Sequence, residues 1–82
     1  MLYCVDEVSY ILQVERAWVY YHLRMYNISA LKIGDSWRIT ELGLDDAVRL
    51  FVSKRAGEVA SDNGLEGYSE RLAHIRQTYA EN

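Results

Sequence analysis

The chain has 82 residues, which is the size of one small domain. Half of the residues are hydrophobic, enough for one modest core, and the formal net charge of −3 gives no overall attraction for nucleic acid. A single cysteine excludes an intrachain disulfide. No apolar run approaches the ~20 residues of a membrane-spanning helix, and the first residues carry no export signal. We therefore expect a cytoplasmic protein with no membrane partner.

The negative charge is concentrated in the last third of the chain. Residues 1–55 contain seven basic and seven acidic side chains, whereas residues 56–82 contain two basic and five acidic ones. Because the first part is neutral, its cations can still attract DNA if they share one face of a domain.

Two short helices are predicted at the start of the chain. Residues 5–12 place four aliphatic side chains near one side of a helix, and two acidic side chains fall in its first turn, where the helix dipole favours anions. A second helix is predicted over about residues 15–26, with apolar positions at i, i+3, i+4 and i+7. Two short helices separated by about three residues match the helix-turn-helix pattern. The apolar positions are Val5, Val8, Ile11 and Leu12 in the first helix and Val19, His22, Leu23 and Tyr26 in the second.

The hydrophobic period then changes to that of strands. Residues 31–33 and 37–39 are predicted to form a hairpin around Gly34, Asp35 and Ser36, where glycine supplies a positive φ. We expect Trp37 to belong to the core, because the residues beside it on the strand alternate with it.

Two further helices are predicted after the hairpin. Thr40 is a suitable N-cap for a third helix, which is expected to continue to about residue 60. The clearest break of the chain lies at residues 61–64, and a last helix is expected over about residues 65–80. We therefore predict a domain at residues 1–60, followed at 61–82 by a linker and a helix that packs on the domain or joins subunits. The apolar stripes comprise Leu44, Ala47, Val48 and Phe51 in the third helix and Leu65, Tyr68, Leu72, Ile75 and Tyr79 in the last.

Four segments of the sequence carry a resemblance to a known family: residues 2–8, 12–14, 18–20 and 31–39. The run Lys32-Ile33-Gly34, followed two residues later by Trp37-Arg38-Ile39, is the most specific part. These segments resemble the excisionase-type and related MerR-like winged helix-turn-helix domains of bacteria and their mobile elements. The chain departs from the family at several positions. The family usually has Thr or Ser at the position of Cys4, and often Gly at Gln13 and Ser at Glu15. It usually has Thr at Trp18, a basic residue at Tyr21 and Gly at Tyr26.

This resemblance covers about residues 2–52 and implies a fold. The expected class is mainly α (α+β): a winged helix-turn-helix with a two-stranded β-hairpin wing. Residues 53–82 lie outside the resemblance and add the C-terminal helix.

The resemblance also implies sequence-specific binding to double-stranded DNA, with the second helix in the major groove and the hairpin on the adjacent backbone or minor groove. We expect Arg16 to read base edges and Arg24 to contact the backbone, while Trp18 either reaches DNA or packs against the hairpin or a partner. The stems of the hairpin, rather than its tip at Asp35, should attract phosphate, and its cations on different strands are expected to lie close together. The predicted DNA-binding residues are Arg16, Ala17, Trp18, Tyr20, Tyr21, Arg24, Lys32 and Arg38.

Several partners and roles follow as expectations. One small module buries too little surface for high specificity, so a homodimer or a cooperative multimer on DNA is expected, with a recombinase or another protein as a further partner. The role is architectural, as in excisionase-like control of recombination, or transcriptional. Two alternatives stay open. One is a winged-helix protein–protein interaction module, which Glu15, Asp35 and the acidic balance favour; the other is an accessory protein of DNA packaging or plasmid transfer.

No catalytic, cofactor-binding or metal-binding set is recognisable in the sequence. Cys4, His22 and His74 lack the spacing of metal ligands, so we expect no metal, no cofactor and no enzymatic activity. His22 is expected to be a packing residue. Cys4 is expected to be a small packing residue near a helix start, with a lowered thiol pKa as the alternative.

Overall fold

The computed structural model describes residues 1–55 and 66–80 of the chain. Within them it contains four helices and one two-stranded antiparallel sheet, which agrees with the expected mainly α class. The predicted break at residues 61–64, the start of the last helix at residue 65 and the end of the third helix near residue 60 lie outside the described residues. The elements are α1 (Val5–Leu12), α2 (Arg16–Arg24), β1 (Ala30–Ile33), β2 (Ser36–Ile39), α3 (Glu41–Arg55) and α4 (Tyr68–Ala80).

Helix α1 begins and ends as its sequence predicts. The Glu7 carboxylate accepts a hydrogen bond from the backbone N–H of Cys4, the N-cap residue, at 2.8 Å. At the other end Gln13 takes a left-handed conformation with φ 57°, and its side-chain amide donates to the carbonyl oxygen of Tyr10 at 2.8 Å. This turn sends the chain into α2 after three residues.

The end of α2 differs from the expectation. The helix stops at Arg24, and Tyr26 does not continue the buried stripe, since it is 88% exposed and has a φ of 58°. A left-handed residue cannot extend a right-handed helix, so its side chain leaves the helical face. Val19 and Leu23 are buried and His22 is half-buried, as predicted.

Strands β1 and β2 form a hairpin tied to the start of the chain. Gly34 has φ 62° at the first central position of the two-residue loop, which is the geometry of a type II′ turn. At the base of the hairpin, Tyr3 and Ile39 exchange two backbone hydrogen bonds of 2.8 and 2.7 Å. The segment before α1 therefore fixes the hairpin to the domain.

Helix α3 starts where it makes a close contact with the loop before β1. Thr40 Oγ1 accepts the backbone N–H of Gly43 at 2.9 Å, which confirms the predicted N-cap. Gly43 is buried so close to this loop that a Cβ atom there would lie 1.9 Å from the carbonyl oxygen of Ser29. Only glycine permits this approach.

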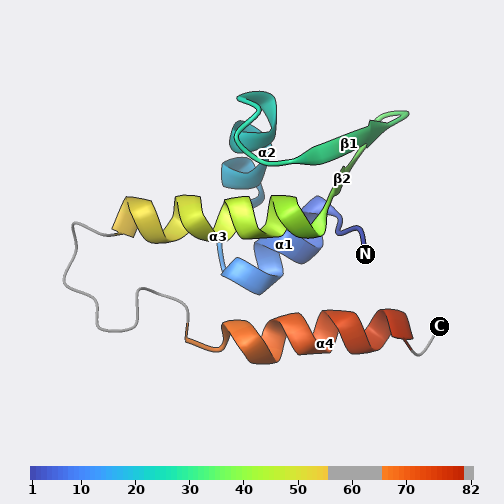
Figure 1. The fold of residues 1–82 in the computed structure, drawn as a ribbon, viewed down its shortest axis with the longest axis vertical. Coiled ribbons are helices and arrows are strands. Elements are labelled where there is room, and N and C mark those ends of the chain that lie inside the picture. Colours follow the sequence, from blue (N-terminus) through green and yellow to red (C-terminus); the bar gives the residue numbers. More distant parts are fainter. Residues whose placement is uncertain (56–65, 81–82) are drawn as a thin grey trace.

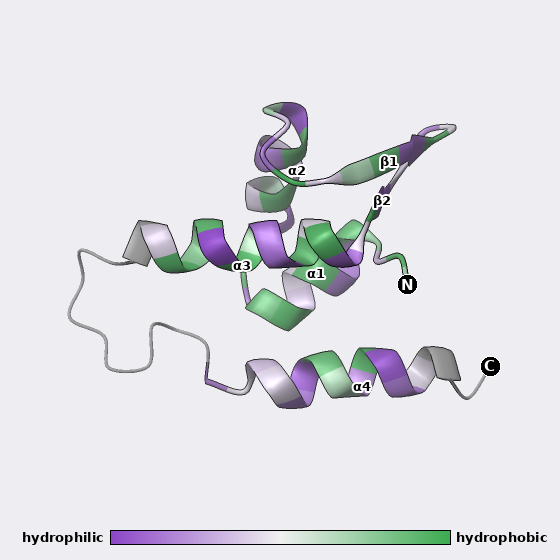
Figure 2. Ribbon diagram, in the orientation of Figure 1, coloured by the Kyte–Doolittle hydropathy of each residue, from purple (hydrophilic) through white to green (hydrophobic). Residues whose placement is uncertain are grey.

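The core lies where α1, α2 and α3 meet the base of the hairpin. The buried aliphatic positions predicted for α1 and for α3 all face this core, with Val48 half-buried. In Figure 2 hydrophobic and hydrophilic stretches alternate along α1, α3 and α4, as expected for helices that each bury one face. None of the described helices is long and apolar enough to span a membrane. The core residues are Tyr3, Val5, Val8, Ile11, Leu12, Val19, Leu23, Ile28, Ile39, Leu44 and Ala47.

Helix α4 packs on the domain beside α1. Tyr68, Leu72 and Ile75 are half-buried against the core, and the Arg71 Nε donates to the carbonyl oxygen of Ile11 at 2.8 Å. Figure 1 shows α4 at one end of the molecule, with α2 and the hairpin at the opposite end. Of the two arrangements predicted for the apolar stripe of the last helix, the described residues adopt packing on their own domain.

Candidate nucleic-acid interface

One side of α2 is open to solvent. Because successive helical residues are rotated by about 100°, Ala17, Tyr21 and Arg24 share one ridge, and all three are exposed. Val19 and Leu23, on the opposite side, are buried. The ridge, defined as Ala17, Tyr21 and Arg24, therefore presents a methyl group, a phenol and a guanidinium in one row.

The two arginines predicted on α2 have different surroundings. Arg24 is exposed and has no hydrogen-bond or ion-pair partner within the described part of the chain. The Arg16 guanidinium donates through Nη1 to Asp6 Oδ1 at 3.0 Å, and this hydrogen bond raises the pKa of Arg16. Arg16 is thus held by the first turn of α1, whereas Arg24 is free to meet a phosphate.

Trp18 is turned away from the ridge. It is half-buried against the core, and its ring meets the edge of the His22 ring at a centroid distance of 4.5 Å. The Tyr21 ring also packs against this imidazole, with a distance of 5.1 Å between the ring centroids. From the sequence, Trp18 is expected either to reach DNA or to pack against the hairpin or a partner. The structure shows it packed against the core of its own domain.

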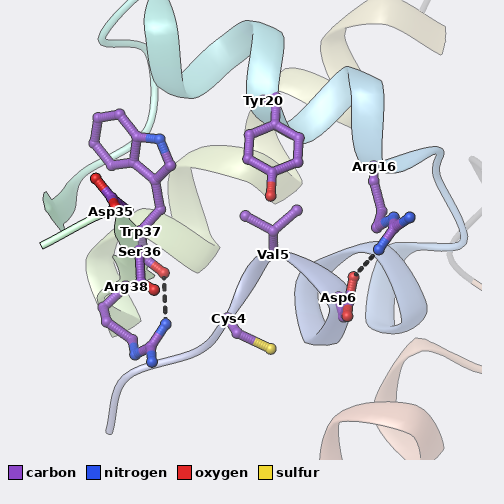
Figure 3. Close-up of a pocket in the computed structure, with 9 residues that line it drawn as sticks. All are labelled: Cys4, Val5, Asp6, Arg16, Tyr20, Asp35, Ser36, Trp37 and Arg38. Atoms are coloured by element: carbon purple, nitrogen blue, oxygen red, sulfur yellow. Dashed lines mark hydrogen bonds and ion pairs between the residues drawn. The ribbon is translucent and has the colours of Figure 1, made fainter. Parts of the chain in front are cut away.

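A small cleft of about 180 Å³ opens between α2 and the hairpin. Figure 3 shows Tyr20 in its centre above Val5, with the pair of Arg16 and Asp6 on one side and Arg38 on the other. The cleft therefore brings together side chains of α1, α2 and β2, which are remote from one another in the sequence. Three of the predicted DNA-binding residues line it.

The two cations of the hairpin do not lie on one face, which corrects the expectation that they are close together. Lys32 pairs with Trp37 across the ladder, whereas Arg38 pairs with Leu31. Since neighbouring residues of a strand point to opposite faces, the two cations project in opposite directions. The Lys32 Nζ lies 4.9 Å from the Trp37 ring centroid, and Arg38 Nη1 donates to the Trp37 carbonyl oxygen at 3.1 Å. Arg38 alone of the two lines the cleft.

Trp37 is only half-buried, so it is less completely a core residue than predicted. It packs against the core and also lines the cleft. Its neighbour Asp35, at the tip of the hairpin, lines the cleft as well and is exposed. The cleft is thus bounded by two carboxylates, those of Asp6 and Asp35, as well as by two guanidiniums.

Asp6, Tyr3 and Gly43 have structural roles that sequence reasoning missed. Asp6 is ten residues from Arg16, a separation that no helical or strand period connects, so only the folded turn brings them together. Tyr3 pairs with Ile39, which is far more remote from it in sequence. The isolated glycine at position 43 was the one readable signal, since glycine within a helix points to a packing constraint.

The thiol of Cys4 is half-buried at the start of α1, in agreement with the expected packing role. Burial raises the pKa of this thiol, so the alternative of a lowered pKa is wrong. Within residues 1–55 and 66–80 no group of three or more His, Cys, Asp or Glu side chains is arranged to hold a metal ion.

In comparisons with known proteins, no family model matched the chain, and no curated protein or solved structure matched it significantly.

Proposed function

We propose that this protein is a winged helix-turn-helix protein that binds double-stranded DNA sequence-specifically and has no catalytic step. The order of two short helices, a hairpin and a third helix supports this fold. Gln13 and Tyr26 give further support. At both positions the resembling family often has glycine, and both take a left-handed conformation here, which glycine adopts without steric cost.

The observation that carries the proposal is the open ridge of α2 beside a hairpin that projects from the domain (Figure 1). An α-helix fits the width of the major groove, where its exposed side chains meet base edges. Ala17 offers a methyl group that suits contact with the methyl of thymine, and Arg24 offers a charge for a phosphate. The phenols of Tyr20 and Tyr21 can donate hydrogen bonds to phosphate oxygens.

In this binding mode the hairpin contacts the DNA strand that lies beside α2. Arg38 lines the cleft, so it contacts the backbone or the minor groove next to the helix. Lys32 projects from the opposite face, beside Trp37, and does not line the cleft, so it reaches other phosphates than Arg38 does. Helix α4 lies at the far end of the molecule and leaves this side accessible (Figure 1).

The proposed role is architectural, as in excisionase-like assembly of a recombination complex, or transcriptional. A single domain of this size covers too few base pairs to be selective in a genome, so two or more copies act on adjacent sites. A recombinase or another protein is the further partner in the architectural case.

Selection of bound duplexes from a random library, followed by fluorescence anisotropy at several salt concentrations, tests the proposal. We expect an enriched motif and a linear fall of log affinity with log salt, with a slope of roughly −0.9 per neutralised phosphate. Arg24→Ala should reduce the magnitude of this slope by about 0.9 and weaken every sequence alike.

Arg49→Ala is the matched control for Arg24→Ala. Arg49 is exposed on α3, carries the same charge and does not line the cleft. Its replacement should therefore change the salt slope much less. Absence of any enriched motif, or equal effects of the two variants, contradicts the proposed docking of α2.

The competing proposal is a protein–protein interaction module, and one observation favours it. Leu31 and Ile33 are 50% and 58% exposed on β1, an unusual place for two aliphatic side chains. An apolar hairpin of this kind suits a protein partner better than a phosphate backbone. A protein that fails to bind any duplex at low salt but captures one defined protein belongs to this class.

A further inference from the structure

We propose that Asp6 is a positioning residue for DNA recognition: it holds Arg16 so that the Nε–Nη2 edge of the guanidinium is free to bind a guanine. This inference rests on the proposed binding of α2 to the major groove. It assigns the DNA site a guanine opposite the first turn of α2, and it gives Asp6 a role in selecting that base.

The atoms of the ion pair lead to this assignment. Asp6 Oδ1 accepts a hydrogen bond from Nη1 of Arg16, at 3.0 Å. The Nε and Nη2 atoms of Arg16 have no hydrogen-bond partner within the described part of the chain. A guanidinium has two bidentate edges, and the edge formed by Nε and Nη2 is the one that this contact leaves unoccupied. Guanine presents O6 and N7 as paired acceptors in the major groove, which match such an edge.

The surroundings of Arg16 favour a base over a phosphate as its partner. Arg16 lies in the first turn of α2, the part of a recognition helix whose residues meet base edges. The Asp6 carboxylate repels a phosphate that approaches Nη1 from the same side. A neutral guanine edge meets far less repulsion, so Asp6 directs Arg16 toward bases.

Fixing Arg16 in advance also lowers the entropy lost on binding. A long side chain that is already restrained loses fewer rotamers when it contacts a base than a free one does. Both side chains of the pair remain accessible to DNA, since Arg16 is 66% exposed and Asp6 69% exposed. Figure 3 shows the pair at the margin of the cleft rather than inside it.

The experiment compares duplexes that differ by one atom. The enriched motif is synthesised with guanine or with 7-deazaguanine, which lacks the N7 acceptor, at each guanine in turn. We expect the parent protein to discriminate about tenfold at one position, since a bidentate pair distinguishes bases strongly. Arg16→Ala should abolish this discrimination. Asp6→Asn should reduce it to about two- to threefold, and Asp6→Glu should restore part of it.

Asp35→Asn is the matched control. Asp35 lines the same cleft and has no hydrogen-bond or ion-pair partner within residues 1–55 and 66–80. Its replacement removes the same charge, so both variants should bind unrelated duplexes more tightly by a similar small factor. Only Asp6→Asn should lose the preference for N7. In the double variant of Arg16→Ala and Asp6→Asn, the second change should have no further effect on that preference.

The outcomes separate this inference from the function on which it rests. If no duplex is bound, the proposed function fails. A second outcome is that duplexes are bound selectively, but at no position do both Arg16→Ala and Asp6→Asn reduce the preference for guanine over 7-deazaguanine. In that case the positioning role of Asp6 is wrong and DNA binding stands. Circular dichroism of each variant confirms that the fold is intact, which is expected because an exposed ion pair adds little to stability.

Discussion

Among the residues that the structure describes, two take the left-handed backbone conformation without being glycine. Gln13 offsets part of the cost with its side-chain hydrogen bond to Tyr10. Tyr26 has no such bond in the described part of the chain, and its ring is almost entirely exposed. A left-handed conformation costs a residue with a Cβ atom roughly 1–2 kcal/mol. Tyr26 is therefore a site where the sequence works against the local fold.

We predict that Tyr26→Gly stabilises the protein by about 0.5–1 kcal/mol. Glycine removes the steric cost at φ 58° but increases the entropy of the unfolded chain, so the net gain is smaller than the strain. Urea denaturation followed by circular dichroism measures the change. Met25→Gly is the control, because Met25 has a φ of −88° and should lose stability instead. Equal effects at the two positions would show that the conformation of Tyr26 is not strained.

At position 43, in contrast to position 26, glycine is the residue that the fold requires. Alanine is a better helix former than glycine by about 1 kcal/mol, so propensity alone predicts that Gly43→Ala is stabilising. The structure predicts the reverse, because the new Cβ would meet the Ser29 carbonyl oxygen, which is backbone and cannot move aside cheaply. We expect a loss of about 2–3 kcal/mol in the free energy of unfolding.

Gly34→Ala separates the two costs that a glycine can impose. Its Cβ would meet no atom of the described residues within 4 Å, so only the strain of the positive φ remains, at about 1 kcal/mol. A Gly43→Ala variant as stable as the parent would mean that α3 does not approach the loop at Ser29 so closely.

At the scale of elements, most bounds of the helices and of the hairpin could be predicted from the local sequence, without knowledge of tertiary contacts. The bounds of α1, the hairpin and the cap of α3 follow from periodicity and turn residues within ten positions of each. The end of α2 could not be predicted, because Tyr26 satisfies the apolar spacing and the left-handed turn leaves no mark in a tyrosine. The ridge of α2 could be predicted from helical spacing, whereas the contact of Asp6 with Arg16 depends on the turn between two helices.

The hairpin offers a prediction that depends on its register alone. Arg38 and Lys32 carry the same charge on neighbouring pairs of the hairpin and project from opposite faces, and only Arg38 of the two lines the cleft. We predict that Arg38→Ala weakens binding of the enriched duplex about five- to tenfold, and Lys32→Ala about twofold. Titrations at one salt concentration measure both. A larger effect of Lys32→Ala would mean that DNA meets the face of the hairpin that carries Lys32 and Trp37.

At the scale of the whole molecule, α4 connects the end of the chain to its beginning. Arg76 donates to Glu41 Oε1 at 2.8 Å and to the Tyr3 hydroxyl at 3.2 Å, and that hydroxyl donates to Glu41 Oε2 at 2.9 Å. Tyr3 also carries the backbone pairing with Ile39. The docking of α4 and the base of the hairpin therefore share one residue.

The apolar side of α4 packs on its own domain, so this side is not available to join two copies of the protein on DNA. The half-buried apolar side chains of α4 face the domain, and its described outer side carries the polar residues Glu70 and Gln77. His74 lies between these two sides, with its ring centroid 6.1 Å from that of Tyr10 of α1. Cooperative binding of copies stays a prediction, and it would involve a polar face of α4 or a different surface. Analytical ultracentrifugation with and without a two-site duplex tests it.

The contacts of Glu41 with Tyr3 and Arg76 make the docking of α4 depend on pH. Partial burial raises the pKa of Glu41, but the hydrogen bonds from Tyr3 and Arg76 outweigh it, so the net pKa is lowered. An unfolded glutamate has a pKa of about 4.3. The contribution of Glu41 to stability is therefore fully present above that value and is lost as the pH falls through the lower folded pKa.

We accordingly predict that Glu41→Gln destabilises the protein at pH 7 and destabilises it less at pH 3, which lies below the pKa of an unfolded glutamate, so that part of the contribution of the charge is lost in the parent. Urea denaturation at both pH values measures the difference between the variant and the parent. Glu70→Gln is the control, since Glu70 is exposed on α4 and has no hydrogen-bond or ion-pair partner within the described residues. The control should be nearly as stable as the parent at both values. If Glu41→Gln shows the same loss at pH 7 and pH 3, the charge of Glu41 does not hold α4, and the packing of Tyr68, Leu72 and Ile75 alone keeps the helix in place.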